Sequence, residues 1–549
     1  MPKKDYSQWD KKELIAHIEK LEKRKKYGLV WDEERTREEF ELAAQNSLPV
    51  LEEVSENAIT TDPEQPTYIL IEGDNYHALS VLNYTHERAV DVIYIDPPYN
   101  TGAKDWKYNN SFVDAEDSYR HSKWISMMHK RLVLAKNVLK QDGVMIVTID
   151  DHELFNLLGI LEDLNATTLG RVAICIKPEG RRQSKYFMEA HEYAIFATWG
   201  IPKMRGLNVD FGLDFPEVDK ISKFRWEGLM RRDAAREDRG SEYWYPFYVS
   251  KDGKISVEKI KGYEVWPINT KGIERVWLWD KNRANDNLTD LKAVIRQDKV
   301  TIYYKRREQG RVKPTSFWYG SKYNANAYGT RVLERIVPKN NFDYPKSVYS
   351  VLDCIDVFLP KDGLVLDFFA GSGTTGHAAM LLNDSDGGSR RFILCTNNEN
   401  QIAEAVTYPR VKNCIVGYKE GKTKVKFGGN LKYFRTSFVP AEPSDENKEL
   451  LTRQSVEMLC LRESTFDFVT ETDIWKIFKN NQRYTAILFD QLSIPDLKEE
   501  LETLNQPVSV YVFSLEDDNF ANEFADMKDK VKVCSIPEAI LRVYRRIYQ

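Results

Sequence analysis

Short apolar runs alternate with a longer amphipathic segment in the first third of the chain. The runs at 68–71, 90–95 and 144–150 are rich in Val and Ile, and each predicts a buried strand. Residues 118–139 repeat their apolar positions at helical spacing and predict a long amphipathic helix. Strands that alternate with helices are typical of a parallel or mixed α/β sheet.

This alternation stops after about residue 168 and returns near residue 363. Residues 363–382 have the pattern of a strand, a glycine-rich turn and a helix, and 390–396 form another apolar run. The pattern therefore indicates one α/β sheet that is built from two distant pieces of the chain, with an insert between them.

The insert is basic, although the whole chain has a formal net charge of -5. Residues 171–330 carry about ten more basic than acidic side chains, and the stretches RWEGLMRR, TIYYKRREQGRVK and SFWYGSKY mix cations with aromatic rings. This mixture suits a phosphate backbone and exposed bases. A solvated basic face over an aromatic core is the alternative, and composition alone leaves both interpretations open.

The two ends of the chain differ from the predicted sheet. Residues 5–60 alternate charges with Leu and Ile at helical spacing, which predicts a helical arm. Residues 441–549 are net acidic by about eight, and the apolar runs YTAILFD and PVSVYVF precede a final amphipathic helix. We expect this last stretch to form a small separate α/β unit.

The length and the composition exclude several classes of protein. A chain of 549 residues is too long for one simple core, so two or three domains are expected. No apolar run is long enough to span a membrane, and the charged beginning has no secretory pattern. The six cysteines are scattered without a CxxC pair, which favours a reducing cytoplasm and predicts no metal site.

The segment VIYIDPPYNTG at 92–102 has the composition of a binding site at the end of a strand. The exocyclic amine of adenine or cytosine is a poor nucleophile, and two hydrogen-bond acceptors can hold its hydrogens in the geometry that attack requires. The Asp96 carboxylate and the Pro97 carbonyl would supply these acceptors, since the two prolines stiffen the loop. The Tyr99 ring would stack on a base swung out of a duplex. The alternative is an ordinary proline-rich turn.

The segment VLDFFAGSGTTGHAA at 365–379 is a second candidate site. Gly371 and Gly373 would let the backbone approach a ligand at the end of a strand. The spacing imitates a nucleotide-binding P-loop, but His377 and Ala378 stand where that loop needs Lys and Ser or Thr. The letters also match the dinucleotide pattern GxGxxG, so only the context can decide between ligands.

Together, DPPY and DFFAGSGTT resemble the amino-methyltransferases that use S-adenosylmethionine to methylate DNA bases. The tetrad precedes the cofactor loop and a basic insert separates them, which looks like the β class. From about 28 to 440 the chain is similar to the modification subunit of type III restriction-modification systems. The segments that carry this resemblance are KYGLVWDEE, LIEGDNYHAL, DPPYNTG, WISMMHKRLVLAKNVL, DGVMIVTIDDHE, FDYPKS, DFFAGSGTTGHA and LKYFRTSF.

The resemblance implies an α/β fold: a permuted seven-stranded Rossmann-like methyltransferase sheet with an inserted target-recognition domain and a small C-terminal α/β domain. The implied domains are a helical N-terminal arm at 1–60, a first core part with the DPPY tetrad at 61–169, the target-recognition insert at 170–335, a second core part with the cofactor loop at 336–440 and the C-terminal domain at 441–549.

The resemblance also implies roles for particular residues. The residues of the target-base pocket would be Asp96, Pro97, Pro98 and Tyr99. The residues that contact the cofactor would be Asp74, Lys346, Asp367, Phe369, Ala370, Gly371, Gly373 and Glu399. A turn acid and a solvated lysine are the alternative interpretations of Asp74 and Lys346. No chemistry is assigned to IDDHE at 149–153, which is expected to cap the next helix.

The implied reaction is direct transfer of a methyl group from S-adenosylmethionine to the N6 amine of an adenine in a short DNA sequence. Cytosine N4 is the nearest alternative, because the same two acceptors serve it; the resemblance associates Asp at position 96 with adenine and Ser with cytosine. A DNA-binding specificity subunit without catalysis and a methyltransferase of RNA are further alternatives.

The partners implied by the resemblance are double-stranded DNA, a second copy of the chain and a separate helicase-nuclease restriction subunit. No nuclease or helicase signature is visible in the sequence, so another subunit would have to cut DNA. No membrane partner is expected, and the cytoplasm is the expected location.

Overall fold

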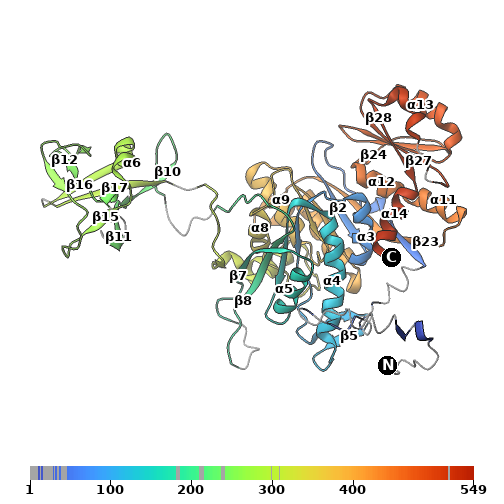
Figure 1. Cartoon of the computed structure of the whole chain (residues 1–549), viewed down its shortest axis with the longest axis horizontal. Helices are drawn as coiled ribbons and strands as arrows, with labels where there is room; N and C mark the ends of the chain where they lie inside the picture. Colours follow the sequence, from blue (N-terminus) through green and yellow to red (C-terminus); the bar gives the residue numbers. More distant parts are fainter. Residues whose placement is uncertain are drawn as a thin grey trace. The chain divides into compact units, whose positions relative to one another are not determined.

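A computed structural model describes residues 46–549 except 110, 181–185, 209–214, 236–240, 298, 308–309, 517, 519 and 549, together with isolated positions between 10 and 38. Most of the helical arm predicted at 1–60 therefore lies outside the described residues, but the prediction is wrong for Ser47–Glu53, which form a strand. The chain forms two compact units (Figure 1). We call Leu207–Pro314 the insert unit, and Met1–Gly206 with Thr315–Gln549 the main unit.

A ten-stranded mixed sheet forms the centre of the main unit. In spatial order its strands are β1 (Ser47–Glu53), β23 (Asn430–Pro440), β2 (Thr67–Glu72), β20 (Arg391–Thr396), β19 (Leu364–Asp367), β3 (Val90–Ile95), β6 (Leu139–Ile149), β8 (His191–Thr198), β7 (Thr167–Cys175) and β18 (Phe317–Trp318). The sheet is wider than the seven strands that were predicted, since β1, β23 and β18 extend its edges.

Parallel pairing joins the two distant pieces of sequence in the middle of this sheet. Strands β23, β2, β20, β19, β3 and β6 all run in the same direction. In the β19–β3 pair, Leu366 stands opposite Ile93. Strand β8 is antiparallel to both of its neighbours. The predicted assembly of one sheet from two pieces is therefore confirmed.

Helices cover both faces of the sheet. Among the described residues of the main unit outside its C-terminal part, the α-helices are α3 (Asn75–Thr85), α4 (Arg120–Val138), α5 (Leu154–Asp163), α7 (Arg331–Ile336), α8 (Val348–Asp356), α9 (Thr374–Asp386) and α10 (Tyr408–Val416). Helices α3, α4 and α5 pack side by side, whereas α8, α9 and α10 form a second layer. The predicted helix at 118–139 corresponds to α4.

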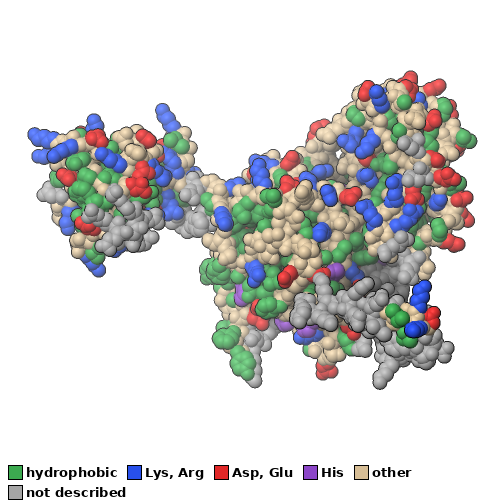
Figure 2. All heavy atoms as spheres, in the orientation of Figure 1, with side chains coloured by type: hydrophobic (Ala, Val, Ile, Leu, Met, Phe, Trp, Pro, Cys, Tyr) green, Lys and Arg blue, Asp and Glu red, His purple; other side chains and the backbone are tan. Residues whose placement is uncertain are grey.

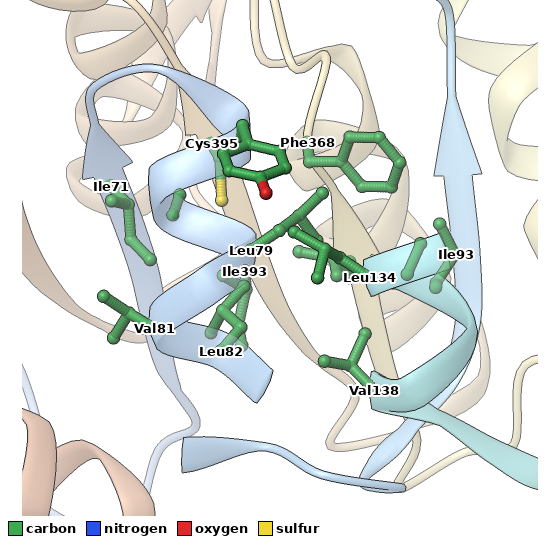
Figure 3. Packing of buried hydrophobic residues seen from close by; sticks show 14 of the residues in the cluster. Ile71, Leu79, Val81, Leu82, Ile93, Leu134, Val138, Phe368, Ile393 and Cys395 are labelled. Carbon is green, nitrogen blue, oxygen red and sulfur yellow. The ribbon is translucent and has the colours of Figure 1, made fainter. Parts of the chain in front are cut away.

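The alternation of side chains along the strands explains why both faces are buried. Ile71, Ile93 and Ile393 point toward α3 and α4, where they meet Leu79 and Leu134 (Figure 3). The intervening strand residues point to the other face and are buried as well, against the layer of α8 and α9. The strands therefore form continuous apolar runs that end abruptly at polar residues.

The insert unit is narrower than the predicted insert at 170–335. Strands β7, β8 and β18 all lie within 167–318 but pair in the main sheet, so the separate unit begins only at Leu207 and ends at Pro314. The prediction placed the boundary where the α/β alternation stops, after about residue 168. The structure shows that the main sheet continues past this point.

The insert unit contains three small sheets around its own aromatic core. The core includes Phe247, Trp277, Trp279 and Ile302. Its elements are β9 (Glu217–Val218), β10 (Lys223–Gly228), β11 (Met230–Ala235), β12 (Phe247–Val249), β13 (Ile255–Ser256), β14 (Tyr263–Val265), β15 (Arg275–Trp277), α6 (Lys281–Asp286), β16 (Leu291–Arg296) and β17 (Lys299–Arg307).

The C-terminal part has its own five-stranded sheet, as predicted, but it packs on the core of the main unit. Its elements are α11 (Asp445–Gln454), α12 (Val456–Glu463), β24 (Asp467–Glu471), β25 (Trp475–Lys479), β26 (Tyr484–Leu488), α13 (Ile494–Glu502), β27 (Val508–Phe513), β28 (Val531–Ile536) and α14 (Glu538–Tyr548). The Tyr544 hydroxyl on α14 donates to the Pro49 carbonyl, and Arg462 donates to the Tyr84 carbonyl at 3.3 Å.

Among the described residues, none of the helices has the length and the apolar character that crossing a membrane requires.

Truncation of Leu79 tests the packing of α3 on the sheet. The Leu79 side chain is fully buried between the helix and the strands, so Leu79→Ala should lower the free energy of unfolding by about 2–5 kcal/mol. Urea denaturation measures this loss. The matched control is Leu492→Ala, because Leu492 is 82% exposed and its truncation should change stability by less than about 0.5 kcal/mol. Equal losses would contradict this packing.

Candidate active site at the carboxyl ends of the central strands

Acidic residues follow the carboxyl ends of four neighbouring parallel strands. Asp96 follows β3, Asp367 is the last residue of β19, Asp74 follows β2 and Glu399 follows β20. Because parallel strands end at the same edge of a sheet, these carboxylates gather along one edge. The two candidate sites of the sequence therefore lie on neighbouring strands, β3 and β19.

The DPPY loop is held rigidly at the end of β3. The Tyr99 hydroxyl and the Thr148 hydroxyl donate to Asp96 Oδ1 at 2.9 and 2.8 Å. Trp124 on α4 is fully buried and donates its indole N–H to the Pro98 carbonyl at 2.7 Å. The Pro97 carbonyl receives no hydrogen bond from the described residues. The loop thus presents one carboxylate and one free carbonyl at the sheet edge.

A buried polar cluster fixes the residue that follows the tetrad. Asn100 is fully buried and adopts a left-handed backbone with φ 57°. Its side-chain amide donates to Glu153, and Trp106 donates to its carbonyl oxygen at 3.0 Å. Burial raises the pKa of Glu153. Glu153 stands at the N-cap position of α5, as expected of IDDHE, but its carboxylate makes no bond to the helix backbone and accepts from the side-chain amides of Asn100 and Asn156.

Lys346 lies against the DPPY tetrad. Its ammonium group is 3.1 Å from Asp96 Oδ1 and 2.7 Å from Glu192 Oε2, and it also donates to the Tyr99 hydroxyl. Burial alone would lower the pKa of Lys346, but the carboxylates of Asp96 and Glu192 raise it overall. The lysine is therefore a buried cation and not the solvated side chain that the sequence left as an alternative.

Glu192 was not predicted to be part of the site. It is almost fully buried on β8, and its Oε1 atom has no hydrogen-bond partner among the described residues. It lines a small cavity together with Tyr99, His191 and Asp150. The sequence offered one signal for this residue: an acidic side chain within an otherwise apolar strand, which is rarely buried without a functional or charged partner.

The glycine-rich loop between β19 and α9 depends on its glycines. Gly371 has φ 48° and Gly373 has φ 76°, a backbone conformation that favours glycine. A Cβ atom on Gly371 would lie 3.1 Å from Phe342, and one on Gly373 would lie 3.3 Å from Thr407. Both glycines therefore pack closely against neighbouring side chains, and a residue with a Cβ atom would be crowded at either position.

A buried arginine braces this loop from behind. Arg410 on α10 is fully buried and donates to the Ser372 hydroxyl at 3.0 Å and to the Thr374 hydroxyl at 2.8 Å. Burial lowers the pKa of Arg410 to about 10. Its position behind the loop was not predicted, because the contact joins segments that lie 36–38 residues apart.

The Asp367 carboxyl group shapes the start of the same loop. Its Oδ1 accepts from the Phe369 backbone N–H at 3.0 Å, and its Oδ2 accepts from the Thr375 hydroxyl at 2.6 Å. Burial raises the pKa of Asp367 to about 7, and the charge of Asp96 adds to this shift. Asn75 donates to the Phe368 carbonyl at 2.9 Å, so α3 also supports the turn.

Asp74 and Glu399 stand at the outer part of the edge. Asp74 caps α3 by accepting from the Tyr76 N–H at 2.8 Å, and its other oxygen is 3.5 Å from Arg131. Glu399 is 3.6 Å from Lys107. Their side chains are 41% and 43% exposed, so each carboxylate is accessible from solvent. Among the described residues no group of His, Cys, Asp and Glu is arranged to hold a metal ion.

The chain belongs to the DNA methylase family, whose profile matches residues 90–407. The match contains both the DPPY tetrad and the glycine-rich loop. The class of protein that the two motifs predicted is therefore confirmed.

Particular relatives place the chain more closely within this family. It is 41% identical over 522 residues to the probable type III restriction-modification enzyme HindVI Mod subunit of Haemophilus influenzae, covering 82% of this chain and 65% of the relative. It is 32% identical over 363 residues to the type II methyltransferase M.KpnI of Klebsiella pneumoniae, covering 64% and 84%. The predicted similarity to Mod subunits is confirmed.

Other matches cover less of the relative. The EcoPI Mod subunit of Escherichia phage P1 is 30% identical over 376 residues, which are 60% of this chain and 57% of that subunit. The chain thus spans little more than half the length of this Mod subunit. Among solved structures, the M1.HpyAVI–SAM complex is 14% identical with a TM-score of 0.29, covering 63% of this chain and 98% of that chain.

The unusual pKa of Asp367 predicts a pH-dependent stability. Because burial raises this pKa from 3.8 to about 7, the folded protein binds a proton that the unfolded chain releases near pH 4. Relative to Asp367→Asn, the wild-type free energy of unfolding should therefore fall by about 2–4 kcal/mol as the pH rises from 4 to 7.

Urea denaturation of both proteins at several pH values measures this difference. Asp473→Asn is the control, because Asp473 is exposed and its replacement should leave the wild-type pH profile unchanged. Parallel profiles for the wild type and Asp367→Asn would contradict the raised pKa.

Proposed function

We propose that this chain is a sequence-specific DNA adenine-N6 methyltransferase and the modification subunit of a type III restriction-modification system. The observation that carries the proposal is the adjacency of two sites. A fixed carboxylate and a free carbonyl in the DPPY loop lie next to a glycine-rich loop on the neighbouring strand. One site suits an amine and the other suits a cofactor, which is the arrangement that methyl transfer between them requires.

The proposed cofactor is S-adenosylmethionine, which supplies a methyl group on a sulfonium when bound. The residues that would hold it are Asp74, Asp367, Phe369, Ala370, Gly371, Gly373 and Glu399. The fit rests on the left-handed turn that Gly371 and Gly373 form at the end of β19, and on two accessible carboxylates at the ends of β2 and β20 that suit hydroxyl and amine donors.

The proposed chemistry at the other site is positioning of the adenine amine. The Asp96 carboxylate and the Pro97 carbonyl would accept hydrogen bonds from its two hydrogens. This favours a tetrahedral nitrogen, whose lone pair is no longer delocalised into the ring and can attack the methyl group. As the new N–CH3 bond forms and the S–CH3 bond breaks, positive charge develops on this nitrogen, and the same acceptors stabilise it. The amine would then release one proton to water and remain as the N6-methyl product, while the electron pair of the broken S–CH3 bond would stay on sulfur.

The target base must leave the duplex to reach these acceptors, because its amine is paired inside the helix. Tyr99 is the proposed stacking partner of the flipped base. Its ring orientation is fixed by the hydrogen bond of its hydroxyl group to Asp96, so the stacking surface and the acceptor belong to one rigid loop.

The proposed catalytic core is a permuted seven-stranded methyltransferase sheet. Its strands would be β2, β20, β19, β3, β6, β8 and β7, in that spatial order. The order supports permutation, because the cofactor loop follows β19 while the catalytic tetrad follows β3, which comes earlier in the chain. The proposed domain plan keeps an N-terminal arm, two core parts and a C-terminal domain, with the insert unit between the core parts.

The insert unit is the proposed target-recognition domain. Cations on its surface lie against aromatic rings: Lys292 is 5.3 Å from the ring centre of the half-buried Trp226, and Arg283 is 5.0 Å from that of Trp279 in the core of the unit. Figure 2 shows Lys and Arg side chains across the visible face of this unit. Such side chains suit phosphate contacts, which set the register for reading base edges.

The proposed partners follow from this assignment. The substrate is double-stranded DNA, the chain acts as a homodimer, and a separate helicase-nuclease subunit cuts DNA. The proposed location is the cytoplasm. Cytosine N4 is the alternative target, and Asp96 favours adenine over it. The observed sites also argue against a subunit without catalysis, since the Asp96 carboxylate is held by hydrogen bonds and its side chain is 29% exposed.

Replacement of Asp96 tests the proposed reaction. The wild-type chain, expressed in a host without DNA methylation, should place N6-methyladenine at one short sequence. Asp96→Ala removes an acceptor of the amine and should abolish this mark, whereas Asp473→Asn at an exposed position should keep it. Single-molecule sequencing of the host DNA measures both. N4-methylcytosine in the wild-type DNA would contradict the adenine assignment.

Removal of one surface cation tests the role of the insert unit. Lys292→Gln should weaken DNA binding and lower the slope of log Kd against log salt by about one, because one phosphate contact is lost. Fluorescence anisotropy over a salt series measures the slope. Lys498→Gln in the C-terminal part is the matched control, and an equal change there would contradict the proposed role.

A further inference from the structure

Three charged side chains meet behind the DPPY loop. Lys346 precedes α8, Glu192 lies on β8 and Asp96 follows β3, so the cluster joins both pieces of the sheet. The ammonium nitrogen of Lys346 is 2.7 Å from Glu192 Oε2 and 3.1 Å from Asp96 Oδ1. A single cation therefore serves two carboxylates.

The burial of this cluster makes the lysine essential to its charge balance. The side chains of Lys346 and Glu192 are 14% and 2% exposed, and that of Asp96 is 29% exposed. Without the cation, two carboxylates would face each other in a poorly solvated place, where ionisation of both is unfavourable. Tyr99, which donates a single O–H, would be the remaining donor between them.

The lysine also determines which oxygen atom of Asp96 is available to the substrate. Oδ1 of Asp96 already accepts from Thr148, Tyr99 and Lys346. Among the described residues no donor contacts Oδ2, so this oxygen is the one left for an incoming amine. The direction of Oδ2 follows from the three donors that hold Oδ1.

The same ammonium group contacts the stacking ring. It donates to the Tyr99 hydroxyl and lies 4.6 Å from the centre of the ring, which is the geometry of a cation–π interaction. The contact fixes the hydroxyl end of the Tyr99 ring, on which the flipped base would stack. The lysine thus fixes the position of both the acceptor, Asp96, and the stacking ring, Tyr99. Both belong to the proposed target-base pocket.

On the basis of the proposed function, we propose that Lys346, held by Glu192, is a positioning residue for the target base. It directs Asp96 Oδ2 toward the amine and holds the hydroxyl end of the Tyr99 ring in place. This assignment replaces the cofactor contact that the sequence predicted for Lys346.

The two roles of Lys346 differ in what its loss should change. Lys346→Met keeps the length of the side chain and removes the charge, so it should lower kcat by about 10- to 100-fold, with the Kd for S-adenosylmethionine within twofold of wild type. A lysine that binds the cofactor would instead raise that Kd at least fivefold and leave kcat at saturating cofactor within twofold. Isothermal titration and steady-state methylation of plasmid DNA measure the two quantities.

A double variant separates charge balance from simple disruption. If Lys346 compensates Glu192 next to Asp96, then removing the excess carboxylate should help the variant that has lost the cation. Lys346→Met/Glu192→Gln should therefore be at least fivefold more active than Lys346→Met alone. If the activity losses of the two single variants add up in the double variant, as expected for two independent structural defects, the positioning role is overturned.

Controls distinguish a failure of this inference from misfolding of a variant and from a failure of the proposed function. Lys140→Met removes a similar ion pair, in which Lys140 and Asp91 are 2.6 Å apart. This pair lies at the amino ends of β3 and β6, away from the DPPY loop, so the variant should keep wild-type kcat. Thermal unfolding shows whether each variant is folded. Wild-type methylation with an unchanged kcat in Lys346→Met overturns only the inference. A wild-type protein that methylates no DNA overturns the proposed function and, with it, the role of Lys346.

Discussion

The parallel pairing of β3 with β19 is the constraint on which the rest of the site depends. It joins segments that are 273 residues apart, and it is locked at its beginning by the hydrogen bond from the Leu364 N–H to the Asp91 carboxylate at 2.8 Å. Because Leu366 stands opposite Ile93, the DPPY loop and the glycine-rich loop leave the sheet next to each other. Methyl transfer needs this adjacency, since an amine and a methyl donor must meet in line.

Rigid placement of polar groups is the second principle of the site. The loops carry little regular structure of their own, but side chains from neighbouring elements hold each of them: Trp124 binds the DPPY loop and Arg410 binds the glycine-rich loop. Trp124 and Arg410 are buried, so they do not compete for the substrate. The acceptors at the sheet edge remain available to bind it. A proposed reaction that consists mainly of positioning a weak nucleophile fits such preorganised surroundings.

The sequence predicted the parts of the site that are local in the chain. DPPY and the glycine-rich loop each combine a strand, a turn and their chemistry within about a dozen residues, so the central strands, α4 and both loops could be predicted. Glu192 and the contacts of Lys346 could not, because they depend on which distant strands become neighbours. The boundary at Leu207 was missed for a related reason: β7 and β8 follow the point where the α/β alternation stops, but they pair in the main sheet.

The central claim is that the edge formed by β3 and β19 transfers a methyl group from a bound cofactor to an adenine amine. The most direct measurement is incubation of the purified chain with deuteromethyl-labelled S-adenosylmethionine and plasmid DNA, followed by mass spectrometry of the nucleosides. The predicted result is N6-deuteromethyl-deoxyadenosine as the labelled product. Label on cytosine, or DNA without label although the chain binds the cofactor, would contradict the claim.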